Sequence, residues 1–517
     1  MRVVILSAEA VPYSKTGGLG DVAGALPKAL KRIGVDSLLI TPCYLQTKGQ
    51  YIWHTAIDDL NVDWRGGVYP AKAFYSEANG SPTFLIDAPS LFHRDSIYGY
   101  REDHERFAFL SRAALTLLRR IGKAPDIVHL NDWHTGFAAV ELAESRFWDE
   151  YWRGTRTVFS IHNMAYQGAF DDGELWKLGF GSQFARNAFA FNGHASAMKA
   201  GLELSDTLST VSRRYAQEIQ TAENGYGLEW LTCQRSNRLI GITNGIDTEV
   251  WDPETDPELP AHYSIDDLSG KRECKRALLE AFSLPVDLDR PVLASVTRLT
   301  AQKGIELMMQ VAGDVLATGA YIISLGSGEP SYEDFWQRLR DLAPRQVGIY
   351  RGYSEPLSHK IEAGADMFMM PSKFEPCGLN QMYSLRYGTV PIVRAVGGLD
   401  DTVDTFDVVD GKGNGFKFGP YRSDKFLERI YEALFAYAQP DVWRKIQLNG
   451  MAADNSWENA ARKYVELYNW ALGRAVPLMD DLGNFTNSAS AYRSKSDQFT
   501  VRGTAICDII HWHNLPI

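Results

Sequence analysis

The sequence predicts an α/β protein made of two Rossmann-like domains that face each other across a cleft. Three observations carry this prediction: short apolar runs alternate with helical patterns, the alternation starts again halfway along the chain, and a segment rich in Pro, Asp and Glu separates the two series. Strands that alternate with helices form βαβ units around a parallel sheet. A length of 517 residues also exceeds one ordinary hydrophobic core and suits two domains.

The first domain is assigned to residues 1–251. Its expected strands are the apolar runs at 3–8, 37–42, 127–130, 157–162, 207–212 and 239–245, and helical periodicity falls between them at 20–33, 104–121 and 135–147. Residues 252–271, where prolines and acidic residues accumulate, are expected to form an interdomain linker.

The second domain, assigned to 272–455, repeats this alternation. Its expected strands are 292–299, 321–326, 348–353, 367–372 and 390–395, with helices at 303–318, 331–342 and 424–438. An amphipathic helix is expected over 456–475, and residues 476–517 form a polar tail without an assigned role. Open α/β sheets bind ligands at the carboxyl ends of their strands, so both domains should present these edges to the cleft.

Composition excludes several classes of partner. A formal charge of −11 disfavours nucleic acid and anionic membranes. No apolar run reaches the ~18–20 residues that cross a bilayer, and Glu9 interrupts the first apolar stretch, so no signal peptide is expected. The five cysteines are scattered without a C-x-x-C pair, which suggests neither a disulfide framework nor a zinc site. We therefore expect a cytoplasmic protein.

The stretch SKTGGLGDV joins the first expected strand to the first expected helix. Gly17 and Gly18 are expected to allow positive φ and close approach of a ligand to the backbone. The free N–H groups of the helix start and the Lys15 ammonium suit an anion, while Asp21 would orient its neighbours or bind a sugar hydroxyl. A tight turn with a surface lysine explains the stretch equally well, and its spacing fits neither a dinucleotide fingerprint nor a Walker A loop.

The stretch TRLTAQKG supplies a second group of cations at an expected strand end. Arg298 offers a planar fork to phosphate oxygens, and Lys303 offers a mobile point charge. Taken alone, two solvated surface cations are the simpler explanation. Because each domain places cations at a strand end, an anionic ligand in the cleft is favoured.

The stretch FEPCGLNQ contains a turn and an expected helix start near Gly378. The N–H groups of Gly378, Leu379 and Asn380 would suit a pyrophosphate. Glu375 suits a sugar hydroxyl or a developing positive charge, or else it stabilises the helix start. Cys377 is expected to be packed or to lie beside the ligand, because no partner histidine is near it in sequence.

The stretches HLNDWHTG and SIHNMAYQG place Asp132, His134, His162 and Asn163 after two strands of the first domain. A lone histidine is usually structural, but two such loops in one domain favour a polar sugar site. The spacing contains no H-E-x-x-H motif, so no metal is expected, and no G-x-S-x-G elbow, which disfavours an α/β-hydrolase.

Taken in chain order, these motifs are specific. KTGGLGDV, DWHTG, IHNMAYQG, NGID, TRLTAQKG, EPCGLNQ and GTVPIVRAVGGLDDTV together resemble the ADP-glucose-type glycogen and starch synthases, glycosyltransferase family five. The resemblance covers residues 1 to about 475. One departure is Asn380, at a position where the family usually has threonine.

The resemblance implies a GT-B fold and a retaining transfer of glucose from ADP-glucose to the non-reducing end of an α-1,4-glucan, without metal or cofactor. It implies that the catalytic residues are Glu375 at the sugar, Arg298 and Lys303 at the pyrophosphate, His162 at the glucose and Asp132 in the same site. The expected substrate contacts are Lys15, Gly17, Gly18, Asp21, Asn163, Asn244, Lys275, Cys377, Gly378, Leu379 and Asn380. The final helix is expected to cross back to the first domain.

Physical reasoning agrees with this division of roles. ADP leaves with negative charge, so cations and a helix start can stabilise it in place of Mg²⁺. Front-face attack is favoured over a covalent intermediate on Glu375, because double displacement needs a carboxylate below the anomeric carbon.

Three alternatives stay open on sequence alone. The donor could be UDP-glucose, since the base pocket cannot be identified. The protein could bind nucleotide sugars or glucans with little activity, although Lys15, Arg298, Lys303 and Glu375 are all present. A nicotinamide oxidoreductase is disfavoured by the absence of G-x-G-x-x-G after the first strand of either domain. The sequence leaves the oligomeric state open.

Overall fold

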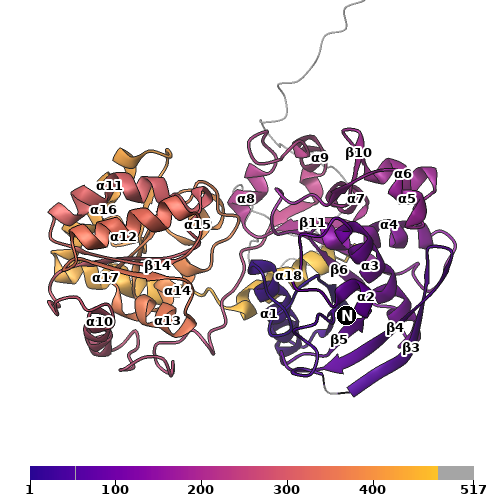
Figure 1. Cartoon of the computed structure of the whole chain (residues 1–517), viewed down its shortest axis with the longest axis horizontal. Helices are drawn as coiled ribbons and strands as arrows, with labels where there is room; N and C mark the ends of the chain where they lie inside the picture. The colour runs from indigo at the N-terminus through magenta and orange to yellow at the C-terminus, as the bar shows by residue number, and fades with distance from the viewer. Residues whose placement is uncertain (53, 475–517) are drawn as a thin grey trace, which may run out of the picture.

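The computed structural model describes residues 1–52 and 54–474, which form two α/β lobes side by side (Figure 1). The first lobe contains a nine-stranded sheet, parallel from β12 to β5 and antiparallel over its last two pairings. Its strands, in spatial order, are β12 (Leu239–Gly241), β11 (Thr207–Thr210), β7 (Arg156–Ile161), β6 (Ile127–Asn131), β1 (Arg2–Leu6), β2 (Asp36–Pro42), β5 (Thr83–Asp87), β4 (Gly67–Ser76) and β3 (His54–Trp64).

The second lobe contains a six-stranded sheet in which every pairing is parallel. Its strands, in spatial order, are β15 (Val347–Arg351), β14 (Tyr321–Gly326), β13 (Val292–Val296), β16 (Met367–Met370), β17 (Val390–Arg394) and β18 (Phe416–Phe418). The predicted fold class, two α/β domains with parallel sheets, is confirmed.

Helices cover both faces of each sheet, as parallel sheets require. Those between the strands of the first lobe are α1 (Gly18–Arg32), α2 (Pro89–Phe92), α3 (Asp103–Arg120), α4 (Gly136–Ser145), α5 (Glu174–Lys177), α6 (Gln183–Phe189), α7 (Ala197–Leu204), α8 (Arg213–Glu218) and α9 (Glu229–Gln234). The later ones are α10 (Ser269–Ala281), α11 (Ile305–Ala317), α12 (Pro330–Leu342), α13 (Glu355–Gly364), α14 (Asn380–Arg386), α15 (Gly397–Thr402), α16 (Ser423–Tyr437), α17 (Pro440–Met451) and α18 (Trp457–Ala471). A small sheet of β8 (Ala169–Phe170), β10 (His194–Ser196) and β9 (Ala190–Phe191) completes the first lobe. Among the described residues, no helix combines the length and the apolar character needed to cross a membrane.

The strand β1 explains why the predicted strands are continuous apolar runs. Val3 and Ile5 face one hydrophobic core, and Val4 and Leu6 face another, so all four side chains are buried. Each such side chain stabilises the fold by roughly 1.5–3 kcal/mol relative to an exposed position. By contrast, β3 is largely exposed and its inward residues alternate with polar ones, which is why apolar runs did not predict it.

The helix α18 packs into the first lobe, although the chain reaches it from the second lobe (Figure 1). Ser456 caps it by accepting a hydrogen bond from the Asn459 N–H at 3.2 Å. Tyr464 and Tyr468 are buried in the same core as Ile5, and the Tyr468 hydroxyl is 2.9 Å from Nδ1 of His129. This agrees with a final helix that crosses back. The predicted tail, 476–517, lies outside the described residues.

The segment predicted as a linker is packed against the second lobe. The Asp256 carboxylate accepts hydrogen bonds from Nδ1 of His359 at 2.7 Å and from the Tyr387 hydroxyl at 2.6 Å. The Trp251 ring lies between the rings of His359 and Tyr383, with 3.8 Å between centroids on each side. The helix α10 also begins within the predicted linker. The acidic residues of this segment thus include a buried hydrogen-bond acceptor, Asp256, which anchors it to the second lobe.

Candidate active site

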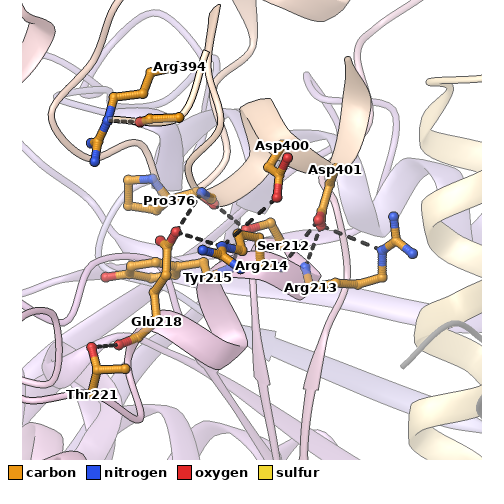
Figure 2. A network of polar contacts seen from close by, with 12 residues as sticks. Ser212, Arg213, Arg214, Tyr215, Glu218, Thr221, Pro376, Arg394, Asp400 and Asp401 are labelled. Atoms are coloured by element: carbon orange, nitrogen blue, oxygen red, sulfur yellow. Dashed lines mark hydrogen bonds and ion pairs between the residues drawn. The ribbon is translucent and has the colours of Figure 1, made fainter. Parts of the chain in front are cut away.

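The two lobes meet through α8 of the first and α15 of the second (Figure 2). The Ser212 hydroxyl donates to the Pro376 carbonyl at 2.6 Å, and the Arg213 N–H donates to the Asp401 carboxylate. Glu218 Oε1 accepts a hydrogen bond from the Gly397 N–H at 3.1 Å. These contacts hold the loop that carries Glu375 against the carboxyl ends of the first lobe's strands.

Asp132 and His162 form a fixed unit at the ends of β6 and β7. Asp132 Oδ1 accepts the His162 N–H at 2.7 Å and the Asn163 N–H at 3.4 Å. Asp132 adopts a φ of 56°, which is strained for a non-glycine residue, and such strain gathers at functional sites. Nε2 of His162 lies 2.9 Å from Oδ1 of Asn131, so Nε2 carries the proton and Nδ1 stays an acceptor. Asp132 therefore positions His162 and Asn163 through their backbone.

Burial keeps the histidines of this edge neutral. Desolvation lowers the pKa of His129 and of His162 to about 3 each, compared with about 6.5 in an unfolded chain. Their folded forms bind fewer protons than the unfolded chain, so the stability they contribute is present above pH ~6.5 and is lost as the pH falls from there towards ~3.

We therefore expect the melting temperature to fall progressively between pH ~6.5 and ~3. His162→Gln should make this decline shallower, because one buried neutral histidine is removed. Thermal unfolding followed by circular dichroism over this pH range measures the difference. Identical pH profiles for the wild type and His162→Gln would contradict the expectation.

The loop of Lys15 and Asp21 is organised by a carboxylate that sequence reasoning missed. Glu9 Oε2 accepts hydrogen bonds from the Thr16 N–H and from the Gly17 N–H, the latter at 3.3 Å. Lys15 Nζ pairs with Asp21 Oδ1 at 2.7 Å. Burial raises the pKa of Asp21 although Lys15 opposes the shift, and the charge of Glu355 in α13 adds to it. This loop therefore faces the second lobe.

The expected positive φ at Gly17 and Gly18 was wrong. Gly17 has a φ of −147° and precedes the first turn of α1, and Gly18 is not among the residues with positive φ. A Cβ atom at either position would meet nothing within 4 Å. The glycines therefore leave open space beside the helix start, while Glu9 occupies the Thr16 and Gly17 N–H groups just before it.

Glu9→Ala is expected to lower kcat/KM by roughly 10- to 100-fold, because a loop displaced by about 1 Å can cost 10²-fold in rate. Glu9→Gln should lose less, since the amide oxygen still accepts one N–H. Tyr98→Phe is the matched control, because it removes only the 3.2 Å hydrogen bond from the Tyr98 hydroxyl to Glu9 Oε1. Steady-state kinetics of the three variants test this, and equal rates for Glu9→Ala and the wild type would refute it.

Lys303 and Glu375 form an ion pair at the carboxyl edge of the second sheet. Lys303 Nζ lies 2.5 Å from Glu375 Oε2, which also accepts the Ser372 hydroxyl at 3.2 Å. Both side chains of the pair are largely buried. The Arg298 side chain is exposed at the same edge, and in the part of the chain that the structure describes its guanidinium has no acidic partner. One cation is thus fixed and the other is available to an anion.

The loop after Glu375 carries the predicted backbone donors. Gly378 has a φ of 72°, and a Cβ there would lie 2.5 Å from Oε1 of Gln381, so glycine is required. Gly378, Leu379 and Asn380 are half-buried, and α14 begins at Asn380, two residues after the predicted start. Nδ2 of Asn380 donates to the Val296 carbonyl at 2.7 Å, so this side chain ties α14 to β13.

Asn244 and Cys377 connect the two lobes. The buried Cys377 thiol accepts a hydrogen bond from the Asn244 N–H, and burial raises its pKa to about 12. Cys377 packs within the hydrophobic core of the first lobe, which agrees with the expectation that this thiol is packed. Oδ1 of Asn244 is buried without a partner among the described residues, and it borders a polar cavity of ≈ 210 Å³.

Lys275 does not join the site. Its ammonium donates to Asp366 Oδ2 at 2.7 Å, to the Leu288 carbonyl at 2.9 Å and to the Tyr437 hydroxyl at 3.0 Å. Asp366 precedes β16 and also accepts the N–H of Val292, so the lysine lies at the amino edge of the sheet. The expected contact with the donor was wrong, because the opposite edge carries the site residues.

His134 packs in the interior of the first lobe. It is buried and stacks on Tyr98 with 4.8 Å between ring centroids.

The sequence contained a signal for the missed Glu9, since a carboxylate inside an apolar run must be paired or hydrogen-bonded. No comparable signal marked Asn131 or Tyr98.

Comparison with known proteins adds to this geometry. The family model for the starch synthase catalytic domain matches residues 2–233, and the model for group 1 glycosyl transferases matches 279–446. A glycogen synthase of Anaeromyxobacter dehalogenans (strain 2CP-C) is 44% identical over an alignment of 485 residues, which covers 90% of this chain and 99% of the relative. A glycogen synthase of Koribacter versatilis (strain Ellin345) is 41% identical over 500 residues, covering 92% and 100% of the two chains.

Solved structures of glycosyltransferases are also similar to this chain. The catalytic domain of starch synthase IV from Arabidopsis thaliana, bound to ADP and acarbose, is 35% identical with a TM-score of 0.83, covering 92% of this chain and 99% of the other. Sucrose-phosphate synthase from Thermosynechococcus elongatus shares the fold, with a TM-score of 0.59 at 17% identity. The oxidoreductase alternative is thereby overturned. The chain belongs to the glycogen and starch synthase family of glycosyltransferases, with the GT-B fold that its motifs predicted.

Proposed function

We propose that this glycosyltransferase moves glucose from ADP-glucose to the non-reducing end of an α-1,4-glucan, with retention of configuration and without a metal. The observation that carries the proposal is the Lys303–Glu375 ion pair at 2.5 Å, with the exposed Arg298 at the same sheet edge. This arrangement offers two cations to a diphosphate and a carboxylate to the attached sugar.

The donor is proposed to lie at the carboxyl edge of the second sheet. Arg298 can bind phosphate oxygens through its fork, and Lys303 can stabilise the charge that develops as ADP departs. The backbone N–H groups at Gly378 and Leu379 add donors for the diphosphate. The related starch synthase was solved with ADP bound, which supports a nucleoside diphosphate as part of the donor.

The glucose is proposed to lie between Glu375 and the loops of the first lobe. Neutral His162 can accept a sugar hydroxyl through Nδ1, because Nε2 is occupied by Asn131. Asn163 and Asn244 supply further polar contacts. Lys15, held by Asp21, borders the approach of the glucan end. Because the acarbose in the related structure resembles an α-glucan chemically, it supports this choice of acceptor.

The proposed step needs no separate general base. The departing phosphate can take the proton of the acceptor hydroxyl as the new glycosidic bond forms on the face that ADP leaves. Glu375 is engaged by Lys303 and Ser372, and this favours stabilisation of positive charge at the anomeric carbon over nucleophilic attack.

A donor-by-acceptor activity matrix in the presence of EDTA tests the proposal. ADP-glucose and UDP-glucose are each offered with maltooligosaccharides and with glycogen, and the anomeric configuration of the product is determined by NMR. We expect chain extension with ADP-glucose and an α-linkage. Extension only with UDP-glucose would show that the proposed donor is wrong. Activity that requires a divalent metal would refute metal independence. Binding of donor or glucan without extension would favour the alternative of a weakly active binding protein.

A further inference from the structure

Cys43, Asp87 and His93, none of which is assigned to catalysis, come together beyond the ends of β2 and β5. One ligating atom from each side chain lies within 4.8 Å of the other two. Oδ1 of Asp87 is 2.8 Å from Nε2 of His93. A thiol, a carboxylate and an imidazole within this distance are the three side-chain types that bind zinc.

The fold fixes this arrangement through strand pairing. The parallel register of β2 and β5 places Pro42 beside Ile86, so Cys43 and Asp87 follow at the same edge of the sheet. The Cys43 N–H donates to the Ile86 carbonyl at 2.8 Å. His93 is the C-cap residue that follows the short helix α2, and its N–H donates to the Pro89 carbonyl at 3.0 Å. Cys43 is distant in sequence from Asp87 and His93, which explains why cysteine spacing did not predict a site.

Burial makes the group different from an exposed acidic cluster. Cys43 is fully buried and Asp87 is 5% exposed. The His93 side chain is 15% exposed, so an ion can enter on its side. In tetrahedral zinc sites the bond lengths place ligand atoms about 3.3–3.6 Å apart, so shifts of roughly 1 Å would complete the geometry.

We propose that Cys43, Asp87 and His93 bind one zinc-type divalent cation, with water as the fourth ligand. The Cys43 thiol loses its proton to solvent when the metal–sulfur bond forms, and the neutral imidazole keeps its proton on the nitrogen that does not bind the metal. The site is separate from the transfer reaction proposed above and stands or falls independently of it.

The simpler explanation is a His93–Asp87 hydrogen bond beside a packed thiol. Burial and the Asp87 charge raise the pKa of Cys43 to about 12, while Lys48 opposes the shift. Without a cation the thiol thus stays protonated. A cation bound by Asp87 would lower the free energy needed to deprotonate the Cys43 thiol, since metal binding couples to ligand deprotonation.

The test uses the full-length, tag-free chain with Zn²⁺ and with Co²⁺ as a spectroscopic probe. Equilibrium dialysis should retain one Zn²⁺ per chain, and Co²⁺ should give a thiolate-to-metal charge-transfer band. Cys43→Ser should abolish the band and weaken binding at least about 100-fold, because even changes outside the ligand set cost 10- to 100-fold. His93→Ala should weaken binding similarly, and Zn²⁺ should protect Cys43 from alkylation in the wild type.

Controls address the other candidate ligands. Cys233→Ser and Cys507→Ser should keep the band, and His104→Ala should keep the stoichiometry, although His104, Glu105 and Glu174 also lie within 4.8 Å of one another. Circular dichroism verifies that each variant is folded. No bound metal, a band that survives Cys43→Ser, or metal lost in His104→Ala would each overturn the proposal. The alkylation result keeps it testable if Cys43→Ser fails to fold.

Discussion

Glu375→Ala is expected to lower kcat/KM by about 10³-fold, at the upper end of what one preorganised electrostatic contact contributes. The substitution removes the carboxylate proposed to face the anomeric carbon and leaves Lys303, whose side chain is only 18% exposed, without its partner. Breaking a buried pair by removing one partner also costs about 3–5 kcal/mol of stability, a cost reduced here by partial exposure.

Glu375→Gln separates the two effects. It preserves the shape of the side chain and its hydrogen bond with Ser372, but it removes the charge. Initial rates of ADP release and thermal unfolding should be measured for both variants. We expect both to be nearly inactive, with only Glu375→Ala clearly less stable. Activity within a few-fold of the wild type in Glu375→Gln would refute a charge-dependent role.

Arg298→Ala is expected to lower kcat/KM by roughly 10²-fold or more through lost stabilisation of the leaving diphosphate. The melting temperature should not change, because the Arg298 guanidinium is exposed and has no acidic partner among the residues the structure describes. Arg298→Lys should recover part of the rate, since a point charge replaces the fork.

Arg345→Ala is the matched control for Arg298→Ala. Arg345 is an exposed residue of the same domain, but it precedes β15 and therefore lies at the amino edge of the sheet. Its removal should leave kinetics and ADP affinity unchanged. Similar losses in both variants would point to general electrostatic attraction of the donor and would contradict a specific role for Arg298.

The sequence predicted the central strands well because they are buried on both faces. β13 and β14 are mainly apolar and buried along their whole length, with one serine in each strand. The antiparallel extension was missed, because β3 and β4 bury only one face and their polar residues break the apolar run. A run of apolar residues therefore identifies strands that helices cover on both faces. It does not identify strands at the edge of a sheet, where only one face is buried.

The site was predictable where function depends on a local motif and less so where it depends on tertiary contacts. Glu375 and Lys303 were both predicted, but their pairing was not, since 72 residues separate them. Lys275 was misassigned because its sequence motif does not reveal which edge of the sheet its side chain reaches. Glu9 was missed because the sequence does not show that the connection between β1 and α1 folds back, so that the Thr16 and Gly17 N–H groups reach its carboxylate.

The helix α18 is synthesised last among the described elements, but it packs into the core of the first lobe. Tyr464, Leu467 and Tyr468 complete the core that contains Val3 and Ile5, yet they are synthesised after all strands of both sheets. The amino-terminal half therefore leaves the ribosome with only part of this sheet face covered, by α1, and without the part that α18 covers. It must wait, with apolar side chains exposed, until the carboxyl-terminal half has been translated. Chains truncated before residue 456 should consequently aggregate even though every strand of the first sheet is present.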